Sequence, residues 1–221
     1  MKNIEGVTTF LRDMIVKENG DPDRETLNLV PARDGKVYYQ DSCKEYWRAY
    51  FFIQGASCYD AVEKPEDFYE SGKAFGRFQG LLAEYPAAEL TETIPNFHNT
   101  PVRFVAFREA VKKDVCGRAG QVEAEIRFLM DRENEMGIAM DMLRRKELPL
   151  RVTHNDTKLN NIMIDDVTRK AICVIDLDTI MPGLSMFDFG DAIRFGANTG
   201  AEDETDLSKV SISLPLFEIY T

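Results

Sequence analysis

The spacing of apolar residues predicts a helix at the start of the chain. Residues 3–17 carry apolar side chains at intervals of three or four, namely Ile4, Val7, Leu11, Met14 and Ile15. This spacing places them on one face of a helix. The pairs Asn19-Gly20 and Asp21-Pro22 follow directly, and such residues commonly end a helix.

An extended pattern comes next. Short apolar runs occupy residues 27–30 and 37–39, with Asp34-Gly35 between them, and this arrangement predicts a β-hairpin. The aromatic-rich segment 45–53 predicts a further strand. Residues 54–57 then interrupt the pattern. We therefore expect two lobes: a partial N-lobe of one helix and antiparallel strands over residues 1–54, and a C-lobe over residues 55–221.

Helical spacing returns in the second part of the chain. Pro65 sits where a helix can begin, and Phe68, Phe75 and Phe78 then fall on one face. Apolar residues spaced along one helical face from residue 122 onward predict one long helix that reaches residue 148. The predicted helices of this part are residues 65–84, 101–114, 122–148 and 187–195.

Three short apolar runs surround one polar loop. They predict strands at residues 148–152, 162–164 and 171–175. The loop between the first two reads His-Asn-Asp-Thr-Lys-Leu-Asn-Asn over residues 154–161, and the third run leads into Asp176. Pro182-Gly183 predicts a turn after these strands. Residues 201–206 are acidic and expected to be exposed, and the chain ends in an amphipathic stretch over residues 217–221.

Composition and charge narrow the classes of protein. The chain has 221 residues, of which 44% are hydrophobic and 29% charged, as in an ordinary globular protein. Its net charge of −11 argues against nucleic acid or an anionic membrane as a general partner. No apolar run approaches membrane-spanning length, and the N-terminus lacks the apolar region of a signal peptide. Four scattered cysteines without a Cys-x-x-Cys pair indicate reduced thiols in a cytoplasmic protein.

The polar loop carries the residue types of a phosphoryl-transfer site. Asp156 is suited to accept or orient the proton of an attacking hydroxyl, and Lys158 to meet the transferring phosphate. Asn161 and Asp176 supply oxygen atoms that suit Mg²⁺, and they lie five and twenty residues after Asp156. We therefore expect Asp156, Asn161 and Asp176 to converge on one site that uses ATP and Mg²⁺.

Each of these residues also has an ordinary structural interpretation. Asp and Asn commonly cap turns between strands, Lys158 could be an exposed loop lysine, and Asn160 competes with Asn161 for the role of ligand. A buried carboxylate at a strand end is unfavourable without a partner, and a cation would supply one for Asp176. Each residue alone is a weak indicator. The combined pattern His-Asn-Asp-x-Lys-x-x-Asn followed by Ile-Asp is a specific indicator of a phosphoryl-transfer loop.

His154 and the charged residues after Asp176 complete the candidates. His154 could act as a general base, although we favour a structural role in which its hydrogen bonds hold Asp156 in place. Asp178, Asp188 and Arg194 could bind an acceptor substrate or orient the loop. For Arg194 the ordinary alternative is an ion pair with Asp188 or Asp191.

These motifs resemble a known family. His-Asn-Asp-Thr-Lys-Leu-Asn-Asn with the later Val-Ile-Asp-Leu-Asp-Thr resembles the catalytic core of the aminoglycoside phosphotransferase-like small-molecule kinases, which include choline and homoserine kinases. Residues 151–203 are most similar to bacterial N-acetylhexosamine 1-kinases. The resemblance implies an α+β, two-lobed protein-kinase-like fold with a helical C-lobe, Asp156 as the base, Asn161 and Asp176 on Mg²⁺, and nucleotide near residues 50–56.

The chain also departs from that family pattern. A nucleotide-covering hairpin and a phosphate-gripping strand lysine are expected before the first helix, and further helices that close the sugar pocket are expected after Thr221. We therefore expect a chain truncated at both ends, with an incomplete N-lobe and slow transfer on its own. Asn155 stands where many aminoglycoside enzymes have Gly, which argues against an antibiotic as the acceptor.

The sequence thus predicts a kinase of carbohydrate metabolism. We expect it to phosphorylate the anomeric hydroxyl of an N-acetylhexosamine, with a small-molecule sugar as its partner and with neither nucleic acid nor membrane. The alternatives are another small-molecule kinase of the aminoglycoside or choline type, a glycosyltransferase that uses Asp176-Leu177-Asp178 as a DxD motif, and an inactive fragment that only binds ligand.

Overall fold

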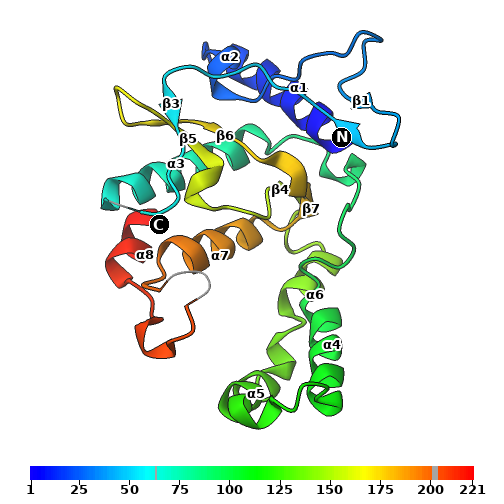
Figure 1. The fold of residues 1–221 in the computed structure, drawn as a ribbon, viewed down its shortest axis with the longest axis vertical. Coiled ribbons are helices and arrows are strands. Elements are labelled where there is room, and N and C mark those ends of the chain that lie inside the picture. Colours follow the sequence, from blue (N-terminus) through cyan, green and yellow to red (C-terminus); the bar gives the residue numbers. More distant parts are fainter. Residues whose placement is uncertain (63, 201–203) are drawn as a thin grey trace. The chain divides into compact units, whose positions relative to one another are not determined.

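The computed structural model describes residues 1–62, 64–200 and 204–221. Residue contacts divide the chain into two compact units, a larger unit of residues 1–93 and 151–221 and a helical unit of residues 94–150. Figure 1 shows the elements of both units in chain order. Residues 201–203 of the predicted acidic stretch lie outside the described residues. The lobe division predicted at residue 54 stays a prediction.

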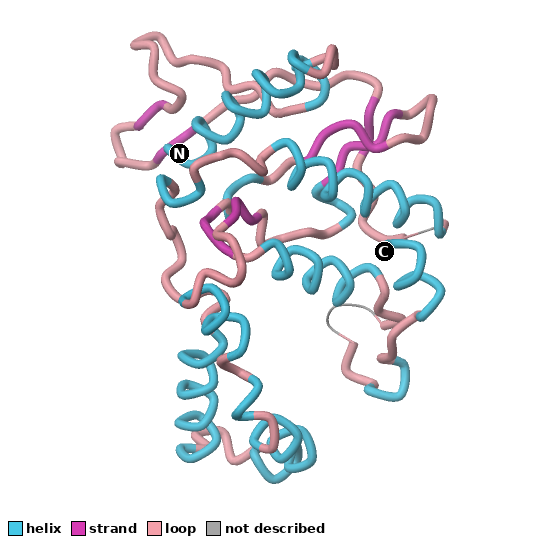
Figure 2. The backbone as a smooth tube through the Cα atoms, turned by 180° about the vertical axis from the view of Figure 1, so that it is seen from behind, coloured by secondary structure: helices cyan, strands magenta, loops and turns pink. Residues whose placement is uncertain are grey.

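The larger unit mixes helices with three small antiparallel sheets (Figures 1 and 2). Its helices are α1 (Lys2–Lys17), α2 (Pro22–Glu25), α3 (Pro65–Leu81), α7 (Ser185–Gly196) and α8 (Leu214–Tyr220). Its strands are β1 (Tyr39–Gln40), β2 (Tyr46–Trp47), β3 (Ala56–Ser57), β4 (Arg151–Thr153), β5 (Ile162–Asp165), β6 (Ala171–Val174) and β7 (Met181–Gly183). The sheets are β1-β2, β3-β5-β6 and β4-β7.

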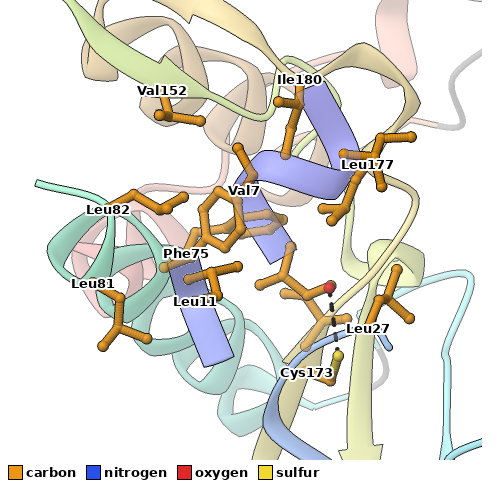
Figure 3. Close-up of a cluster of buried hydrophobic side chains, with 14 of the residues drawn as sticks. Val7, Leu11, Leu27, Phe75, Leu81, Leu82, Val152, Cys173, Leu177 and Ile180 are labelled. Atoms are coloured by element: carbon orange, nitrogen blue, oxygen red, sulfur yellow. Dashed lines mark hydrogen bonds between the residues drawn. The ribbon is translucent and has the colours of Figure 1, made fainter. Parts of the chain in front are cut away.

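One apolar core joins α1, α3 and the β3-β5-β6 sheet. The predicted face of α1 is buried, with Ile4, Val7, Leu11 and Ile15 at most 3% exposed. These side chains belong to one cluster with Phe75 and Phe78 of α3 and with Ile162, Ile164 and Cys173 of the sheet. Figure 3 shows Val7 and Leu11 of this cluster with Phe75 and Cys173. The sheet and α3 are therefore rigid supports for the loop that precedes β5.

The helix and strand predictions around this core are confirmed with small shifts of their ends. The predicted helix 65–84 ends at Leu81, and the predicted helix 187–195 begins at Ser185. Strands 162–164 and 171–175 are present as β5 and β6, whereas the strand predicted at 148–152 lies at 151–153. Pro149 lacks the N–H that a paired strand uses, so the strand begins only after it.

The predicted pairing of residues 27–30 with 37–39 is wrong. The Val30 N–H donates to the Ala49 carbonyl at 2.9 Å and the Phe51 N–H to the Asn28 carbonyl at 2.9 Å, so the 28–30 segment lies against 49–51. Residues 39–40 instead pair with 46–47. Asp41 explains this choice, because its carboxylate accepts hydrogen bonds from the Cys43 and Glu45 N–H groups and closes that turn.

The turn predicted at Pro182-Gly183 is also wrong, because both residues belong to β7. Pro182 lies opposite Val152 and Gly183 opposite Arg151. A two-stranded sheet tolerates proline, since each strand has an unpaired edge. Gly183 is needed for close approach, because a Cβ atom there would lie 2.6 Å from Thr153 Oγ1. This strand pair fixes the entrance to the polar loop.

The helical unit is built from α4 (Thr100–Lys113), α5 (Glu123–Met130) and α6 (Ile138–Arg144). The prediction for residues 101–114 is confirmed, but the single long helix over 122–148 is wrong. The chain leaves the helical path between Asp131 and Gly137, where Asn134 and Gly137 both disfavour a helix interior. Phe104 is the one buried apolar side chain among the described residues of this unit.

The described residues contain no helix that is both long enough and apolar enough to cross a membrane.

Candidate active site

The polar loop leaves β4 through an unusual backbone conformation at Asn155. This residue has φ +67°, in the left-handed region that Gly and Asn tolerate best. Its amide Nδ2 donates to the carbonyls of Thr153 at 3.1 Å and Thr179 at 2.7 Å. The conformation accounts for either Asn or Gly at this position, so the identity of residue 155 says little about the acceptor.

The loop brings Asp156, Lys158 and Asn161 into direct contact. Asn161 Nδ2 donates to Asp156 Oδ2 at 2.9 Å and to the Asp156 carbonyl at 2.8 Å. Lys158 Nζ lies 3.5 Å from the other carboxylate oxygen, Asp156 Oδ1. Asp156 keeps 30% of its side chain exposed and Lys158 keeps 29%. A partly exposed carboxylate is thus held between an amide and an ammonium group.

Asp176 follows Ile175, whose backbone is bonded to both ends of the loop, at His154 and at Asn161. The Ile175 N–H donates to the Asn161 carbonyl at 2.9 Å, and the Ile175 carbonyl lies 2.8 Å from His154 Nε2. Asp176 itself is exposed and has φ +55°. The backbone before Asp176 is therefore bonded to that of Asn161, and a shared ion between their two side chains stays a prediction.

His154 is fully buried and anchors the loop. Its ring packs edge-on against Phe75 and Phe78 of α3, with ring centroids 5.4 and 6.0 Å apart. Nδ1 accepts a hydrogen bond from the Asp156 N–H at 3.3 Å, so the neutral ring donates from Nε2 to the Ile175 carbonyl. This geometry suits the structural role that we favour, because His154 holds both Asp156 and the residue before Asp176.

Two carboxylates of α7 hold the loop from the other side. Asp188 Oδ2 accepts from the His154 N–H and Oδ1 from the Asn155 N–H, both at 2.9 Å. Gln79 of α3 donates to the same carboxylate at 2.5 Å. Asp188 is only 3% exposed. Burial raises its pKa, and the hydrogen bonds from the His154 and Asn155 backbone oppose that rise. Of its two predicted roles, orienting the loop fits this geometry and contact with an acceptor does not.

Asp191 and Arg194 extend the same arrangement. Asp191 Oδ2 accepts from the Thr157 N–H at 2.8 Å, and Oδ1 accepts from Arg194 Nη2 at 2.9 Å. Arg194 thus makes the ion pair that we weighed as its ordinary role, although 58% of its side chain is exposed. Its guanidinium and the Lys158 ammonium lie 4.4 and 4.7 Å from the centroid of the Phe195 ring. Phe195 therefore gives Lys158 a second support beside Asp156.

Comparison with known proteins places this site in a family. Residues 28–209 match the model of the family described as "Phosphotransferase enzyme family". The chain belongs to that phosphotransferase family. Solved structures agree on the fold, and they include an aminoglycoside phosphotransferase from Alicyclobacillus acidocaldarius (TM-score 0.60, 12% identity). A spectinomycin phosphotransferase solved with ADP and spectinomycin (0.51, 16%) and a microcompartment-associated aminopropanol kinase (0.53, 20%) are also similar.

These similarities cover a larger share of this chain than of the other proteins. The three structures match 87%, 83% and 87% of this chain, and 58%, 56% and 58% of their own chains, in the order given. The chain thus spans less than two thirds of their length. The predicted α+β, protein-kinase-like fold and the membership of the aminoglycoside phosphotransferase-like kinases are confirmed.

Several residues that shape the site were not identified by the sequence analysis. Arg48 Nη2 binds Asp178 Oδ2 at 2.6 Å, so Asp178, a predicted substrate-binding residue, has an internal partner. Gln79 binds Asp188, and the Thr179 hydroxyl donates to the His154 carbonyl at 2.6 Å. Arg48 and Gln79 lie far from the motif in sequence, so no local spacing could indicate them. Thr179 directly follows Asp178 and could have been considered.

The donor set fits a phosphate-bound Mg²⁺ better than an ion enclosed by protein. Across the described residues, no three or more His, Cys, Asp or Glu side chains form a group able to hold a metal. Asn161 and Asp176 offer one amide oxygen and one carboxylate. Because Asn161 Nδ2 is bonded to Asp156, Oδ1 is the atom left for an ion. Mg²⁺ commonly keeps several waters and binds substrate phosphates with one or two protein ligands.

Proposed function

We propose that the chain is the catalytic core of an ATP- and Mg²⁺-dependent kinase that phosphorylates a hydroxyl group of a small molecule. The observation that carries this proposal is the pair of contacts on the Asp156 carboxylate, from Asn161 at 2.9 Å and Lys158 at 3.5 Å. A carboxylate held this way, with part of its surface open, can accept a proton from an incoming hydroxyl. Membership of the phosphotransferase family supports the same reaction.

The loop residues have different roles in the proposed reaction. Asp156 orients the acceptor hydroxyl and takes its proton, while Lys158 faces the negative charge that develops on the transferred phosphoryl group. Asn161 and Asp176 would hold Mg²⁺, which neutralises phosphate charge when bound. His154, Asp188 and Asp191 touch the loop backbone rather than the open side of Asp156, and they serve to fix its geometry.

We propose an N-acetylhexosamine as the acceptor, phosphorylated at its anomeric hydroxyl. A cavity of about 510 Å³ adjoins Lys158, and its lining includes one basic and one acidic side chain, Lys158 and Asp60. Asn160, Asn198 and Thr199 add neutral polar groups. The buried Asn160 Oδ1 has no hydrogen-bond partner among the described residues, so a hydroxyl or amide N–H of a ligand could bind it. A polycationic aminoglycoside would need more carboxylates than this lining offers.

The glycosyltransferase alternative is weaker on this geometry. A DxD motif would need both Asp176 and Asp178 for a metal and its nucleotide sugar, but Asp178 is engaged by Arg48 at 2.6 Å. The contact of Asp156 with Asn161 has no function in that scheme. An antibiotic or amino-alcohol acceptor remains the second candidate, supported by the similarity in fold to a spectinomycin phosphotransferase and an aminopropanol kinase.

Charge and cysteine usage support the remaining parts of the proposal. The net charge of −11 and four free cysteines suit a cytoplasmic enzyme without a nucleic-acid or membrane partner.

An acceptor panel tests the proposed function. The chain, and a version extended at both ends, would be incubated with Mg·ATP and with N-acetylglucosamine, N-acetylgalactosamine, spectinomycin or 1-amino-2-propanol. Phosphorus NMR would identify the product. The proposal expects a sugar 1-phosphate from an N-acetylhexosamine and a rate for the other acceptors at least about tenfold lower. Transfer only to an amino alcohol or antibiotic would contradict the sugar assignment, and transfer to none of them by either version would contradict the kinase assignment.

A further inference from the structure

Arg48 is the most buried of the arginines that form ion pairs in the described part of the chain. Its side chain is 21% exposed, whereas those of the others are 38% exposed or more. It follows β2 and reaches the turn after Asp176, where Nη2 binds Asp178 Oδ2 at 2.6 Å. A guanidinium is therefore bound to Asp178, two residues after Asp176, the carboxylate that the proposed function assigns to Mg²⁺.

The other donors of this guanidinium lack strong partners. Arg48 Nε is buried without a hydrogen bond of normal geometry to a described residue. Nη1 lies 4.0 Å from the Met1 sulfur, and a thioether is a weak acceptor. The Tyr50 hydroxyl next to Arg48 is also buried. It makes no hydrogen bond of normal geometry to a described residue, but side-chain hydrogen bonding with Arg48 contributes to the pKa of both groups. Buried donors of a charged group are normally bonded to strong acceptors, whereas the donors of this guanidinium that do not bind Asp178 have only a phenol and a thioether beside them.

The surroundings of Tyr50 show how near this pair lies to the proposed phosphate site. Its ring centroid is 5.5 Å from the Arg48 guanidinium carbon. Burial raises the pKa of the Tyr50 phenol, Arg48 opposes the rise, and the carboxylates of Asp178 and Asp176 add to it. Arg48 and Tyr50 thus face the turn that carries both carboxylates.

We propose that Arg48 binds the phosphates of the nucleotide, and that Asp178 holds its guanidinium in place until the nucleotide arrives. The proposal rests on the proposed function, because it needs a nucleotide whose phosphates lie near Asp176. A planar guanidinium can bind a phosphate through two parallel hydrogen bonds, which a carboxylate partner on one nitrogen still allows. Asp178 is 55% exposed and can turn into solvent when phosphate replaces it.

Calorimetric titration of Arg48→Gln with adenosine, Mg·ADP and Mg·ATP tests this role. Loss of charge-assisted bonds to phosphate should weaken Mg·ADP and Mg·ATP about 10- to 100-fold. Adenosine has no phosphate, and its dissociation constant should stay within about twofold. A merely structural ion pair predicts instead that all three ligands weaken together or that none does.

Arg77→Gln is the matched control. Arg77 forms an ion pair of the same length, 2.6 Å, with Glu25 in the same unit, and it contacts none of the proposed site residues. Its loss should leave the affinity for all three ligands unchanged.

Two further variants keep the test decisive if Arg48→Gln does not fold. Arg48→Lys keeps the charge but not the planar fork, so Mg·ATP should weaken less than in Arg48→Gln, and adenosine should not change. Asp178→Asn removes the same ion pair but frees the guanidinium, so Mg·ATP should bind at least as tightly as in the unaltered chain. Weaker Mg·ATP binding by Asp178→Asn would overturn the proposal.

The unaltered chain separates this proposal from the proposed function. If it binds Mg·ATP and Arg48→Gln binds it equally well, Arg48 is not a phosphate ligand, and the kinase assignment stands. If neither the unaltered chain nor the version extended at both ends binds Mg·ATP, the kinase assignment fails and this proposal falls with it.

Discussion

At the scale of single residues, the loop residues differ in what they touch, and this difference predicts their effects. Lys158 contacts Asp156 Oδ1 and the Phe195 ring at a partly exposed position. Its packing contribution is small, whereas its charge faces the proposed phosphoryl group.

We therefore predict that Lys158→Ala lowers kcat by on the order of 100-fold with a melting temperature nearly unchanged. Steady-state kinetics and thermal unfolding would measure the two effects in the version extended at both ends. Lys170→Ala, which removes an exposed lysine of the same unit, is the control and should leave both quantities unaltered. Full turnover in Lys158→Ala would make it an ordinary loop lysine.

Cys173 gives a second prediction at this scale, which concerns the core rather than the site. Burial raises the pKa of the Cys173 thiol to about 12, so almost no thiolate exists at pH 8 in the folded chain. Cys43 and Cys116 are exposed free thiols. Iodoacetamide at pH 8 should therefore label Cys43 and Cys116 within minutes, and Cys173 only after denaturant is added.

Mass spectrometry of the labelled peptides would follow this reaction. Because a raised thiol pKa leaves the neutral form dominant up to about 12, labelling of Cys173 should increase only at strongly alkaline pH or on unfolding. Labelling of Cys173 as fast as Cys43 at pH 8 would contradict the burial of β6.

At the scale of elements, α7 links the loop to α3. Its first half carries Asp188, and its last residue, Gly196, lies against the ring of Phe68 in α3. A Cβ atom at Gly196 would clash with the Phe68 ring, whereas no described atom lies within 4 Å of one at Gly190. Gly196 therefore leaves room for the Phe68 ring, whereas a larger residue would fit at Gly190.

We predict that Gly196→Ala destabilises the fold by about 1–3 kcal/mol, because α7 must move away from α3. Gly190→Ala is the matched variant, and it should stabilise the fold by about 0.5–1 kcal/mol, since alanine favours a helix and meets no neighbour. Urea unfolding of both would measure the difference. Equal effects of the two substitutions would show that α7 and α3 do not pack as described.

The contact of Asp188 in α7 with the backbone of His154 and Asn155 gives a further prediction. Asp188→Asn replaces one acceptor oxygen with an NH₂ group that faces backbone N–H donors or Gln79. We expect a loss of about 2–4 kcal/mol in the free energy of unfolding, together with a fall in kcat that exceeds the change in KM. Unchanged stability, measured by urea unfolding, would show that this buried carboxylate does not hold the loop.

At the scale of the whole molecule, local sequence signals indicated which loop residues lie together but not how distant segments pair. The loop 154–161 connects β4 and β5, which are consecutive in the chain although they belong to different sheets. Its residues therefore meet through short-range geometry that spacing can indicate. The partners of residues 28–30 and of β4 are set by tertiary packing, which no local pattern contains. Pro182 and Gly183 show this, because the sequence analysis interpreted them as a local turn, whereas both pair with residues of β4.

The long helix predicted over residues 122–148 failed for a local reason. Met136 is the one apolar residue in 131–137, and Asn134 and Gly137 lower helix propensity there. Arg48 and Gln79 were invisible to sequence reasoning, because an arginine and a glutamine with no motif around them are ordinary surface residues until their partners are known.

The central claim is that Asp156 takes the proton of an acceptor hydroxyl while phosphate is transferred from Mg·ATP. The most direct measurement compares Asp156→Asn with the unaltered sequence, both in the version extended at both ends, for Mg·ATP affinity and for transfer to an N-acetylhexosamine. Asp166→Asn, an exposed acid on the turn after β5, is the control. We predict Mg·ATP affinity within about twofold and a transfer rate lower by about 10²- to 10⁴-fold for Asp156→Asn alone. Transfer by Asp156→Asn at the rate of the control would contradict the account.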